Sequence, residues 1–237
     1  MPKAVVCLPT YNERENLEAM LRALADKGVR VLVIDDNSPD GTGELADRLA
    51  AQVDYVDVLH RERKDGLGPA YVAGFRRALA DGADLVLEMD CDFSHDPVDV
   101  PRLIAAAGEA DVVLGSRYVS GGGVRNWGLL RRFVSAGGSW YARVLLGVSV
   151  RDLTGGFKCY RRAVLERIDL DAIDSKGYAF QIETTYRALR AGFRVEEIPI
   201  TFADREAGGS KMSKAIVAEA MWKVPSLRLA ALTGRLR

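Results

Sequence analysis

The sequence predicts a single α/β domain in which helices flank a mainly parallel β-sheet. Apolar segments with the composition of β-strands alternate with helical segments through the first half of the chain. These strand segments are almost continuously apolar, which is typical of parallel strands covered on both faces. The chain has 237 residues, of which 48% are hydrophobic and 28% charged, so it is long enough to bury one full core.

The first half of the chain alternates regularly. Strands are expected at residues 3–9, 29–35, 53–60, 84–90 and 111–116. The first helix carries apolar residues at helical spacing from Leu17 to Leu24, and Asn12 with Glu15 ahead of it resembles a capping box. Further helices are expected near residues 42–49, at 69–79 and after Pro97, where Asp96 is placed to cap the chain.

The second half is less regular. A glycine-rich stretch at 118–127 precedes an expected helix at 129–146, and a turn with a short strand is expected within 153–162. A helix at 179–190 and a strand at 193–202 follow, and then a polar loop at 204–213. The last helix has an apolar stripe from Met212 to Val224 and is expected to break at Pro225. We therefore expect a catalytic domain over residues 1–214 and a C-terminal amphipathic helical tail over 215–237.

Composition narrows the function classes. Lys plus Arg and Asp plus Glu both number 33, and this zero net charge argues against a nucleic-acid partner. Cys7, Cys91 and Cys159 are far apart and odd in number, which argues for a reducing cytosol rather than a disulfide framework. No window reaches the ~18 consecutive apolar residues of a spanning helix. We expect a cytoplasmic protein that reaches a membrane only peripherally or through a partner subunit.

Acidic residues follow several of the expected strands. Asp90 and Asp92 come after an apolar run, and Asp35 with Asp36 ends an earlier strand. In parallel sheets, ligands bind beyond the carboxyl ends of the strands. A lone D-x-D is more often a pair of solvated loop aspartates, but several acidic clusters at one sheet edge favour a binding site. These carboxylates could bind a divalent metal, ribose hydroxyls or base N–H donors.

Several common motifs are missing from the positions where they would stand. PTYNE follows the first strand in place of the glycine-rich dinucleotide fingerprint, and neither a P-loop nor a G-x-S-x-G elbow is present. His60 and His95 are interpreted as loop or packing residues. The segment GYAFQIE (177–183) either faces an acceptor or packs as a helix, and Glu183 is ranked low as a functional residue.

The ordered motifs PTYNERENL, VIDDNSPDGT, MDCDFSHDP, LTGGFKCYRR and DREAGGSKM resemble those of the inverting family-2 glycosyltransferases of the GT-A fold. Within that family they are most similar to the dolichol-phosphate and polyprenol-phosphate mannose synthases. The resemblance extends from Pro9 to about Lys214. It implies a Rossmann-like GT-A sheet and a nucleotide-sugar donor.

The resemblance also implies a donor site. The guanine nucleotide would be held by Pro9, Tyr11, Glu13, Ile34 and Asp36. The ribose-diphosphate side and a Mg²⁺ or Mn²⁺ ion would be bound by Asp90 and Asp92, with Ser94 as a further metal ligand. Cys91 would touch the ligand through its backbone. Arg205 and Lys211, in the late loop, would close over the diphosphate.

The acceptor side is implied in the same way. Arg117, Arg131 and Ser135 would receive the phosphate of a polyprenyl or dolichyl monophosphate, and Asp92, Arg117 and Arg131 would be the catalytic residues. The physical chemistry agrees, because guanidinium groups grip phosphate oxygens and a phosphate nucleophile needs no strong general base. Residues 125–132 hold three arginines and no acid.

The expected reaction moves mannose from GDP-mannose to the lipid phosphate with inversion, at the cytosolic face of a membrane. The nearest rival reaction uses UDP-glucose or another nucleotide sugar on the same kind of acceptor. The sequence also leaves open a non-catalytic nucleotide-sugar-binding subunit and a transferase that acts on a soluble saccharide.

Overall fold

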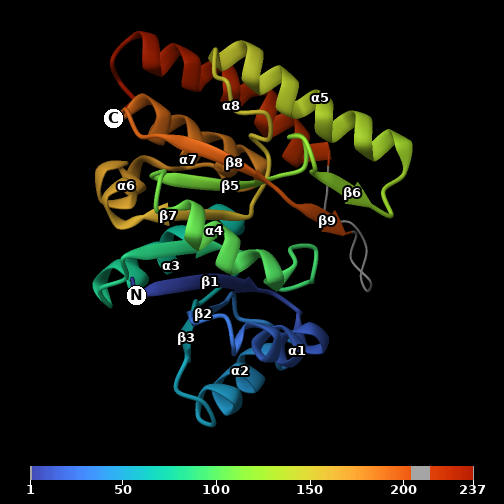
Figure 1. Cartoon of the computed structure of the whole chain (residues 1–237), viewed down its shortest axis with the longest axis vertical. Coiled ribbons are helices and arrows are strands. Elements are labelled where there is room, and N and C mark those ends of the chain that lie inside the picture. Colours follow the sequence, from blue (N-terminus) through green and yellow to red (C-terminus); the bar gives the residue numbers. More distant parts are fainter. Residues whose placement is uncertain (1, 204–213, 237) are drawn as a thin grey trace.

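The computed structural model describes residues 2–203 and 214–236, and a seven-stranded sheet forms its centre (Figure 1). The strand order is β3-β2-β1-β4-β7-β5-β8, and only the two pairings of β7 are antiparallel. The predicted mainly parallel sheet is therefore confirmed. The strands are β1 (Ala4–Thr10), β2 (Arg30–Asp35), β3 (Val56–His60), β4 (Leu85–Glu88), β5 (Val112–Ser116), β7 (Lys158–Arg161) and β8 (Val195–Pro199).

Helices cover both faces of the sheet. One face packs against α3 (Leu67–Ala80), α5 (Leu129–Leu146), α6 (Arg162–Arg167), α7 (Tyr178–Arg190) and α8 (Lys214–Leu232). The other face packs against α1 (Arg14–Leu24), α2 (Thr42–Ala50) and α4 (Val100–Ala106). Short 3₁₀ turns lie at Pro97–Asp99 (η1) and Leu170–Ala172 (η2).

The strands are apolar on both faces because both faces are buried. In β1, Val5 and Cys7 join the core beneath α3, whereas Val6 and Leu8 join the core beneath α1. This alternation is the ordinary consequence of the two-residue period of a strand. A parallel sheet covered on both sides aligns the carboxyl ends of β1, β2, β4 and β5 at one edge.

The expected strand at 193–202 is divided between two sheets. Its first part is β8, and its second part is β9 (Thr201–Ala203), which pairs in parallel with β6 (Gly123–Arg125). Ile200 lies at the division, and its backbone N–H donates to the carbonyl of Ser116 over 3.1 Å. The prediction of one strand was wrong. Residues 195–199 pair with β5 and residues 201–203 pair with β6, and because the two segments are separated by one residue, the sequence pattern alone does not show the division.

The capping box expected at Asn12 and Glu15 is not formed. Asn12 has a left-handed backbone with φ of 59°, and α1 begins after Glu13 without a side-chain cap bond. Instead, the N–H groups of Asn12 and Glu13 donate to the hydroxyls of Ser38 and Thr42 at 3.1 Å each. Tertiary contacts from the next loop replace the local cap. The Asp96 cap is confirmed, since its carboxylate accepts the Val98 N–H at 3.0 Å.

The expected break at Pro225 is also absent, because α8 continues to Leu232. A proline inside a helix leaves the carbonyl four residues earlier without its N–H donor. That carbonyl belongs to Met221, and it accepts a hydrogen bond of 3.0 Å from the Tyr141 hydroxyl on α5. A neighbouring helix thus supplies the missing donor.

Within residues 2–203 and 214–236, no helix combines the length and apolar character needed to cross a membrane. The C-terminal helix α8 packs against α5 and α7, with Val224 and Leu227 in the core. The functional division at residue 214 stays a prediction.

Candidate active site at the carboxyl edge of the sheet

The loop after β4 carries the paired carboxylates. Since β4 ends at Glu88, both Asp90 and Asp92 lie beyond the strand, in a turn rather than on opposite faces of a sheet. The Asp90 N–H donates to His95 Nδ1 over 3.1 Å, and Asp92 Oδ1 accepts the Ser94 N–H over 3.1 Å. Phe93, which lies between Asp92 and Ser94, has a left-handed φ of 59°. These local bonds hold the two aspartates on one folded loop.

His95 anchors this loop to the core. Its ring is buried and stacks on Phe157 with centroids 4.9 Å apart. Burial lowers the pKa of His95 to about 4, so the ring is neutral near pH 7. Because Nδ1 accepts from Asp90, the ring proton of the neutral form is on Nε2. His95 is therefore a packing residue, as predicted, and it also has a second role, because its hydrogen bond to the Asp90 N–H holds the acidic loop.

The oxygen atoms of this loop fit a hard divalent cation. Asp92 is 5% exposed and Ser94 2% exposed, so both face a largely water-excluded space. The hydroxyl oxygen of Ser94 is buried and has no hydrogen-bond partner among the described residues. Two carboxylates and a hydroxyl are the donor types that Mg²⁺ accepts alongside phosphate oxygens.

A buried polar layer lies directly under the acidic loop. Glu88 on β4 stands opposite Lys158 on β7, and Tyr160 donates to Glu88 Oε1 over 2.9 Å. Lys158 Nζ donates to the carbonyl of Gln181 over 2.8 Å. Burial raises the pKa of Glu88 and lowers that of Lys158 to about 8. No pattern in the sequence predicted that these four residues lie beneath the site.

The ends of β1 and β2 form the adjacent part of the edge. Pro9 is in register with Ile34, so the two predicted nucleotide-binding segments are side by side. The carboxylate of Asp36 pairs with Arg61 at 2.6 Å. Burial raises the pKa of Asp36, and Arg61 opposes that rise. The Asp36 carboxylate is therefore held in one orientation by Arg61.

Two further predicted residues lie on the loop after β1. The ring of Tyr11 carries the Lys64 ammonium at 3.8 Å from its centroid. The carboxylate of Glu13 accepts a hydrogen bond of 2.9 Å from Asn16. The loop thus places an aromatic ring and a carboxylate at the mouth of the β1–β2 edge.

Some predicted residues turn their side chains away from the site. Ile34 is fully buried, and a methyl group added to Gly74 would meet its Cδ1 at 2.4 Å. Cys91 is 2% exposed, with its thiol in the core beneath α1 and α4. These residues can meet a ligand only through backbone atoms. Asp35 is structural, since it accepts hydrogen bonds from Thr10 and Ser38.

The basic side of the site starts at the end of β5. Arg117 is buried, and its Nε and Nη2 donate to Asp152 over 2.7 and 2.6 Å. Burial disfavours the charge, but Asp152 outweighs it and raises the pKa of Arg117. Nη2 also donates to Thr154 over 2.8 Å. Arg117 is thus held in one orientation and partly neutralised.

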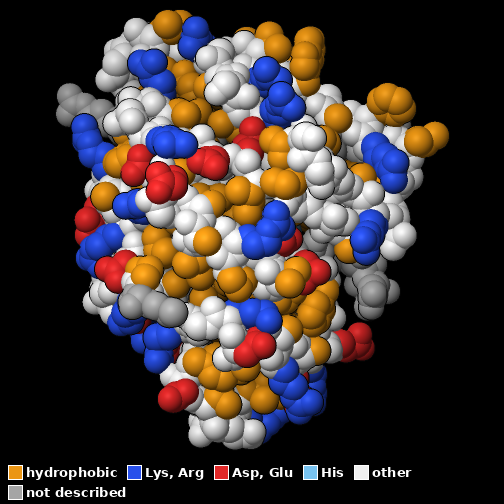
Figure 2. Space-filling view, in the orientation of Figure 1, with side chains coloured by type: hydrophobic (Ala, Val, Ile, Leu, Met, Phe, Trp, Pro, Cys, Tyr) orange, Lys and Arg blue, Asp and Glu red, His pale blue; other side chains and the backbone are white. Residues whose placement is uncertain are grey.

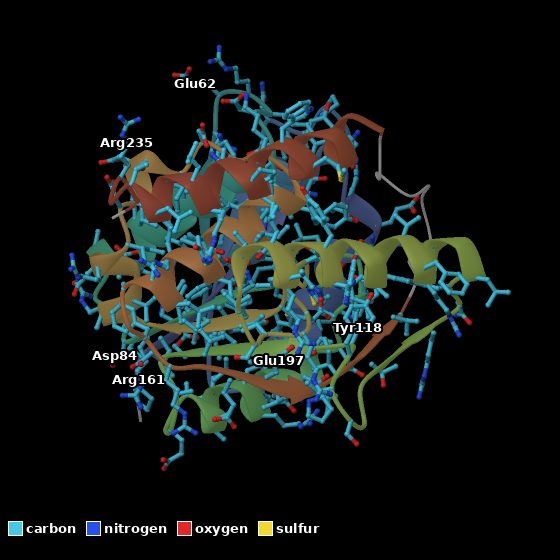
Figure 3. All side chains as sticks on the ribbon, turned by 90° about the horizontal axis from the view of Figure 1, so that it is seen from above. Glu62, Asp84, Tyr118, Arg161, Glu197 and Arg235 are labelled. Atoms are coloured by element: carbon cyan, nitrogen blue, oxygen red, sulfur yellow. The ribbon has the colours of Figure 1, made fainter. Side chains whose placement is uncertain are left out.

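Arg131 and Ser135 lie on α5, one turn apart. The guanidinium carbon of Arg131 is 4.3 Å from the centroid of Trp127. The Ser135 hydroxyl accepts a hydrogen bond of 2.8 Å from Tyr118, which lies beside α5 in Figure 3. The inward side of α5 therefore brings both predicted acceptor residues toward the end of β5, which Arg117 directly follows.

A chain of rings joins the basic and acidic sides. Trp127 packs edge-on against Phe202 at 5.4 Å, and Phe202 packs edge-on against His95 at 5.3 Å. Arg117 lies over both Trp127 and Phe202 at 5.5 Å. Since His95 bonds the Asp90 backbone, the structure brings the predicted carboxylates and arginines into one neighbourhood.

One cavity of the structure does not coincide with this constellation. It has a volume of about 730 Å³ and lies between α1, η1 and the β6–β9 pair. None of the predicted site residues that the structure describes lines it, although Phe93 and Ala203 border both regions. The chemistry of the residues, rather than the size of the cavity, defines the candidate site. Arg205 and Lys211 lie outside the described residues.

Three residues that the sequence did not single out hold the site together: Asp152, Trp127 and Thr154. Asp152 stands just before the TGGF turn, which was the one available signal. Glu197 on β8, labelled in Figure 3, accepts the backbone N–H of Asp152 over 2.9 Å. Glu183, ranked low, is a packing residue, because it is fully buried and pairs with Arg187 at 2.9 Å.

Comparison with known proteins finds two relatives that are similar to this chain over nearly its whole length. The chain is 53% identical over 226 residues to the polyprenol monophosphomannose synthase of Mycolicibacterium smegmatis, covering 94% of this chain and 85% of that protein. It is 50% identical over 237 residues to the undecaprenyl-phosphate mannosyltransferase of Micrococcus luteus, covering 99% and 98%.

The fold is similar to that of glucosyl-3-phosphoglycerate synthase from Mycobacterium tuberculosis, crystallised with Mn²⁺, UDP-glucose and phosphoglyceric acid. The TM-score is 0.67 at 21% identity, covering 94% of this chain and 80% of that one. At this identity the likeness concerns the fold alone, and it confirms the expected GT-A architecture. The family model described as Glycosyl transferase family 2 matches residues 5–169, and the chain therefore belongs to glycosyl transferase family 2.

Proposed function

We propose that this protein transfers mannose from GDP-mannose to a polyprenyl or dolichyl monophosphate. Inversion would give a β-linked polyprenyl-phosphate mannose and GDP. The observation that carries the proposal is the identity of 50–53%, over nearly the whole chain, to two proteins named for mannosyl transfer to polyprenol or undecaprenyl phosphate.

A divalent cation, Mg²⁺ or Mn²⁺, belongs to this proposal. Asp90, Asp92 and Ser94 would hold it, and when bound it would stabilise the negative charge that develops on the departing diphosphate. His95 and the Ser94 N–H keep the two aspartates in place. Pro9, Tyr11, Glu13 and Asp36 would orient the nucleoside, together with the backbone at Ile34 and Cys91. Arg205 and Lys211 would complete the donor side.

The acceptor phosphate would meet Arg131, Ser135 and Arg117. A phosphate monoester is largely ionised near neutral pH, so it needs orientation and charge shielding rather than a strong base. The Asp152 pair fixes the direction of the Arg117 guanidinium without consuming all of its five donors. Arg131 and the Ser135 hydroxyl would then align the phosphate oxygen for attack.

The decisive experiment offers radiolabelled GDP-mannose and UDP-glucose, in separate reactions, with a short polyprenyl phosphate. Label in the organic phase is expected from GDP-mannose. Transfer from UDP-glucose instead would overturn the donor assignment. Nucleotide binding without transfer from either donor would favour a non-catalytic nucleotide-sugar-binding subunit.

The acidic loop gives a sharp prediction for variants. Asp92→Ala is expected to lower metal-dependent turnover by on the order of 10²–10³-fold, because charge on the leaving diphosphate loses its counter-ion. Asp96→Ala is the matched control, since Asp96 caps η1 and is exposed. The rates of both variants would be measured across Mg²⁺ and Mn²⁺ concentrations. Unchanged turnover in Asp92→Ala would contradict the metal site.

The basic side of the site, with Arg117 and Arg131, gives a second prediction. Arg131→Ala should reduce kcat/KM for a short, water-soluble prenyl phosphate by about 10- to 100-fold, because a charge-assisted hydrogen bond is lost. The KM for the nucleotide sugar should not change. Arg132→Ala is the control, since Arg132 is exposed and only approaches the Val124 carbonyl at 3.5 Å. Equal losses in the two variants would argue against a specific phosphate contact, and activity on a soluble saccharide would then be tested.

A further inference from the structure

The side of α5 that faces away from the sheet is apolar, although contact with water would favour polar side chains there. Leu129, Phe133, Trp140 and Val144 are 73%, 75%, 66% and 60% exposed. At 3.6 residues per turn, these four positions fall within an arc of about 60°. They line one side of the helix as two pairs, with Ala136 and Gly137 between them, and are not scattered apolar residues of the kind that any surface carries.

The inward side of the same helix is partly polar. Ser135 is bonded to Tyr118, and Ser139 lies 3.1 Å from the Thr154 hydroxyl. A surface helix of a water-soluble protein normally places its polar residues outward and its apolar residues inward. The pattern of α5 is therefore compatible with an outer environment less polar than water.

The neighbouring helix α8 continues this layer. Trp222, Leu229 and Leu232 are 80%, 63% and 70% exposed and share one side of α8. Figures 1 and 3 show α5 and α8 side by side in the same outer layer. Two hydrogen bonds join them, from Tyr141 to the Met221 carbonyl at 3.0 Å and from Arg228 to the Leu146 carbonyl at 3.1 Å. Figure 2 shows hydrophobic side chains projecting at the upper right, where α5 begins.

The charged residues of α5 itself are all positive. The α5 sequence LLRRFVSAGGSWYARVLL contains three arginines and no acidic residue. Arg132 and Arg143 are exposed, and their helical positions lie along one edge of the apolar stripe. An apolar face with aromatic side chains and adjacent cations is the arrangement that binds at an anionic bilayer interface.

We propose that the outer face of α5 and α8 docks on an anionic lipid bilayer. We define this face as Leu129, Phe133, Trp140, Val144, Trp222, Leu229 and Leu232. The function of the docking rests on the proposed lipid-phosphate acceptor: α5 carries the predicted acceptor residues Arg131 and Ser135, so docking sets them at the level of the lipid head groups.

Vesicle binding without any substrate tests the docking directly. The purified full chain is sedimented with vesicles of phosphatidylcholine alone or with phosphatidylglycerol added. Stronger binding is expected with the anionic lipid. Trp140→Glu with Val144→Glu should weaken it at least tenfold, whereas the matched control, Val53→Glu with Val98→Glu, should not, because Val53 and Val98 are exposed elsewhere. Equal binding of both double variants would overturn the proposal.

Tryptophan fluorescence locates the contact. Trp140 and Trp222 lie on the proposed face, whereas Trp127 is 8% exposed beneath Arg131. Brominated lipids should quench the wild-type emission but leave the variant that combines Trp140→Phe with Trp222→Phe largely unquenched. Strong quenching of that variant would contradict the assignment. A lipid-free dimer that the glutamate variant dissociates would instead identify the face as a contact between copies.

Transfer assays separate this proposal from the proposed function. With a short, water-soluble prenyl phosphate the glutamate variant should keep wild-type turnover, and with a long-chain acceptor in vesicles it should lose most of it. Vesicle binding by a protein that transfers no sugar would overturn the proposed function and leave the docking face intact. Equal turnover of variant and wild type on the vesicle acceptor would overturn the docking face and leave the transferase intact.

Discussion

At the scale of single residues, the pairing of Arg117 with Asp152 is the most consequential interaction of the site. Both side chains are buried, and each carries a charge that would be costly without the other. The pair makes Arg117 a guanidinium of fixed direction. Its neighbours Trp127 and Phe202 exclude water around it.

Asp152→Asn should therefore lower the free energy of unfolding by about 3–5 kcal/mol, because Arg117 is left buried without its counter-charge. Glu196→Gln removes the acid of the exposed Arg194 pair and should cost no more than about 1 kcal/mol. Urea denaturation of both variants measures the difference. Equal, small losses would show that the interior around Arg117 is well hydrated.

At the scale of elements, α5 connects the chemistry to the surface. Its inward residues reach Tyr118 and Thr154, and its Tyr141 completes the hydrogen bonding of α8 at Pro225. The expected helix boundary at Pro225 failed for this reason. A proline breaks a helix when no other donor bonds to the carbonyl four residues earlier, which the proline cannot reach with an N–H.

A double-mutant cycle tests that explanation. Tyr141→Phe should destabilise the wild type by about 1 kcal/mol, since the Met221 carbonyl loses its donor. In a Pro225→Ala background the same change should cost less, because alanine restores the helical N–H at that position. The unfolding free energies of the four proteins give the coupling directly. A coupling of zero would mean that the Tyr141 hydroxyl contributes nothing at Pro225.

At the scale of the whole molecule, two cores on either side of one sheet enclose every thiol. Cys7, Cys91 and Cys159 are all free and buried. Burial raises the pKa of Cys159 from 9.0 to about 12 and that of Cys7 further. The native thiols of Cys7 and Cys159 therefore stay protonated where those of the unfolded chain ionise.

This gives a pH dependence of definite sign. Because the pKa of Cys159 is higher in the folded state, its contribution to stability is complete below pH 9.0 and is lost as pH rises from there to about 12. At pH 8, a disulfide reagent should label almost no thiol in the native protein and all 3 in guanidinium chloride. Rapid labelling of the native protein would show that the two cores open easily. Cys159→Ser should reduce the loss of stability above pH 9.0.

The pattern of apolar residues predicted the sheet, its covering layers and most of the elements. It succeeded because the central strands are buried on both faces, and burial is what makes a strand apolar in sequence. The alternation of strands and helices also predicted that the carboxylates after the strands would gather at one edge, since parallel strands end together, whereas Arg131 and Ser135 were implied by the family resemblance. Three outcomes became visible only in the folded chain: the neutralisation of Arg117, the accommodation of Asn12 and Pro225, and the division of residues 193–202 between two sheets. They depend on partners distant in sequence, such as Asp152, Ser38 and Tyr141, whose approach no local pattern encodes.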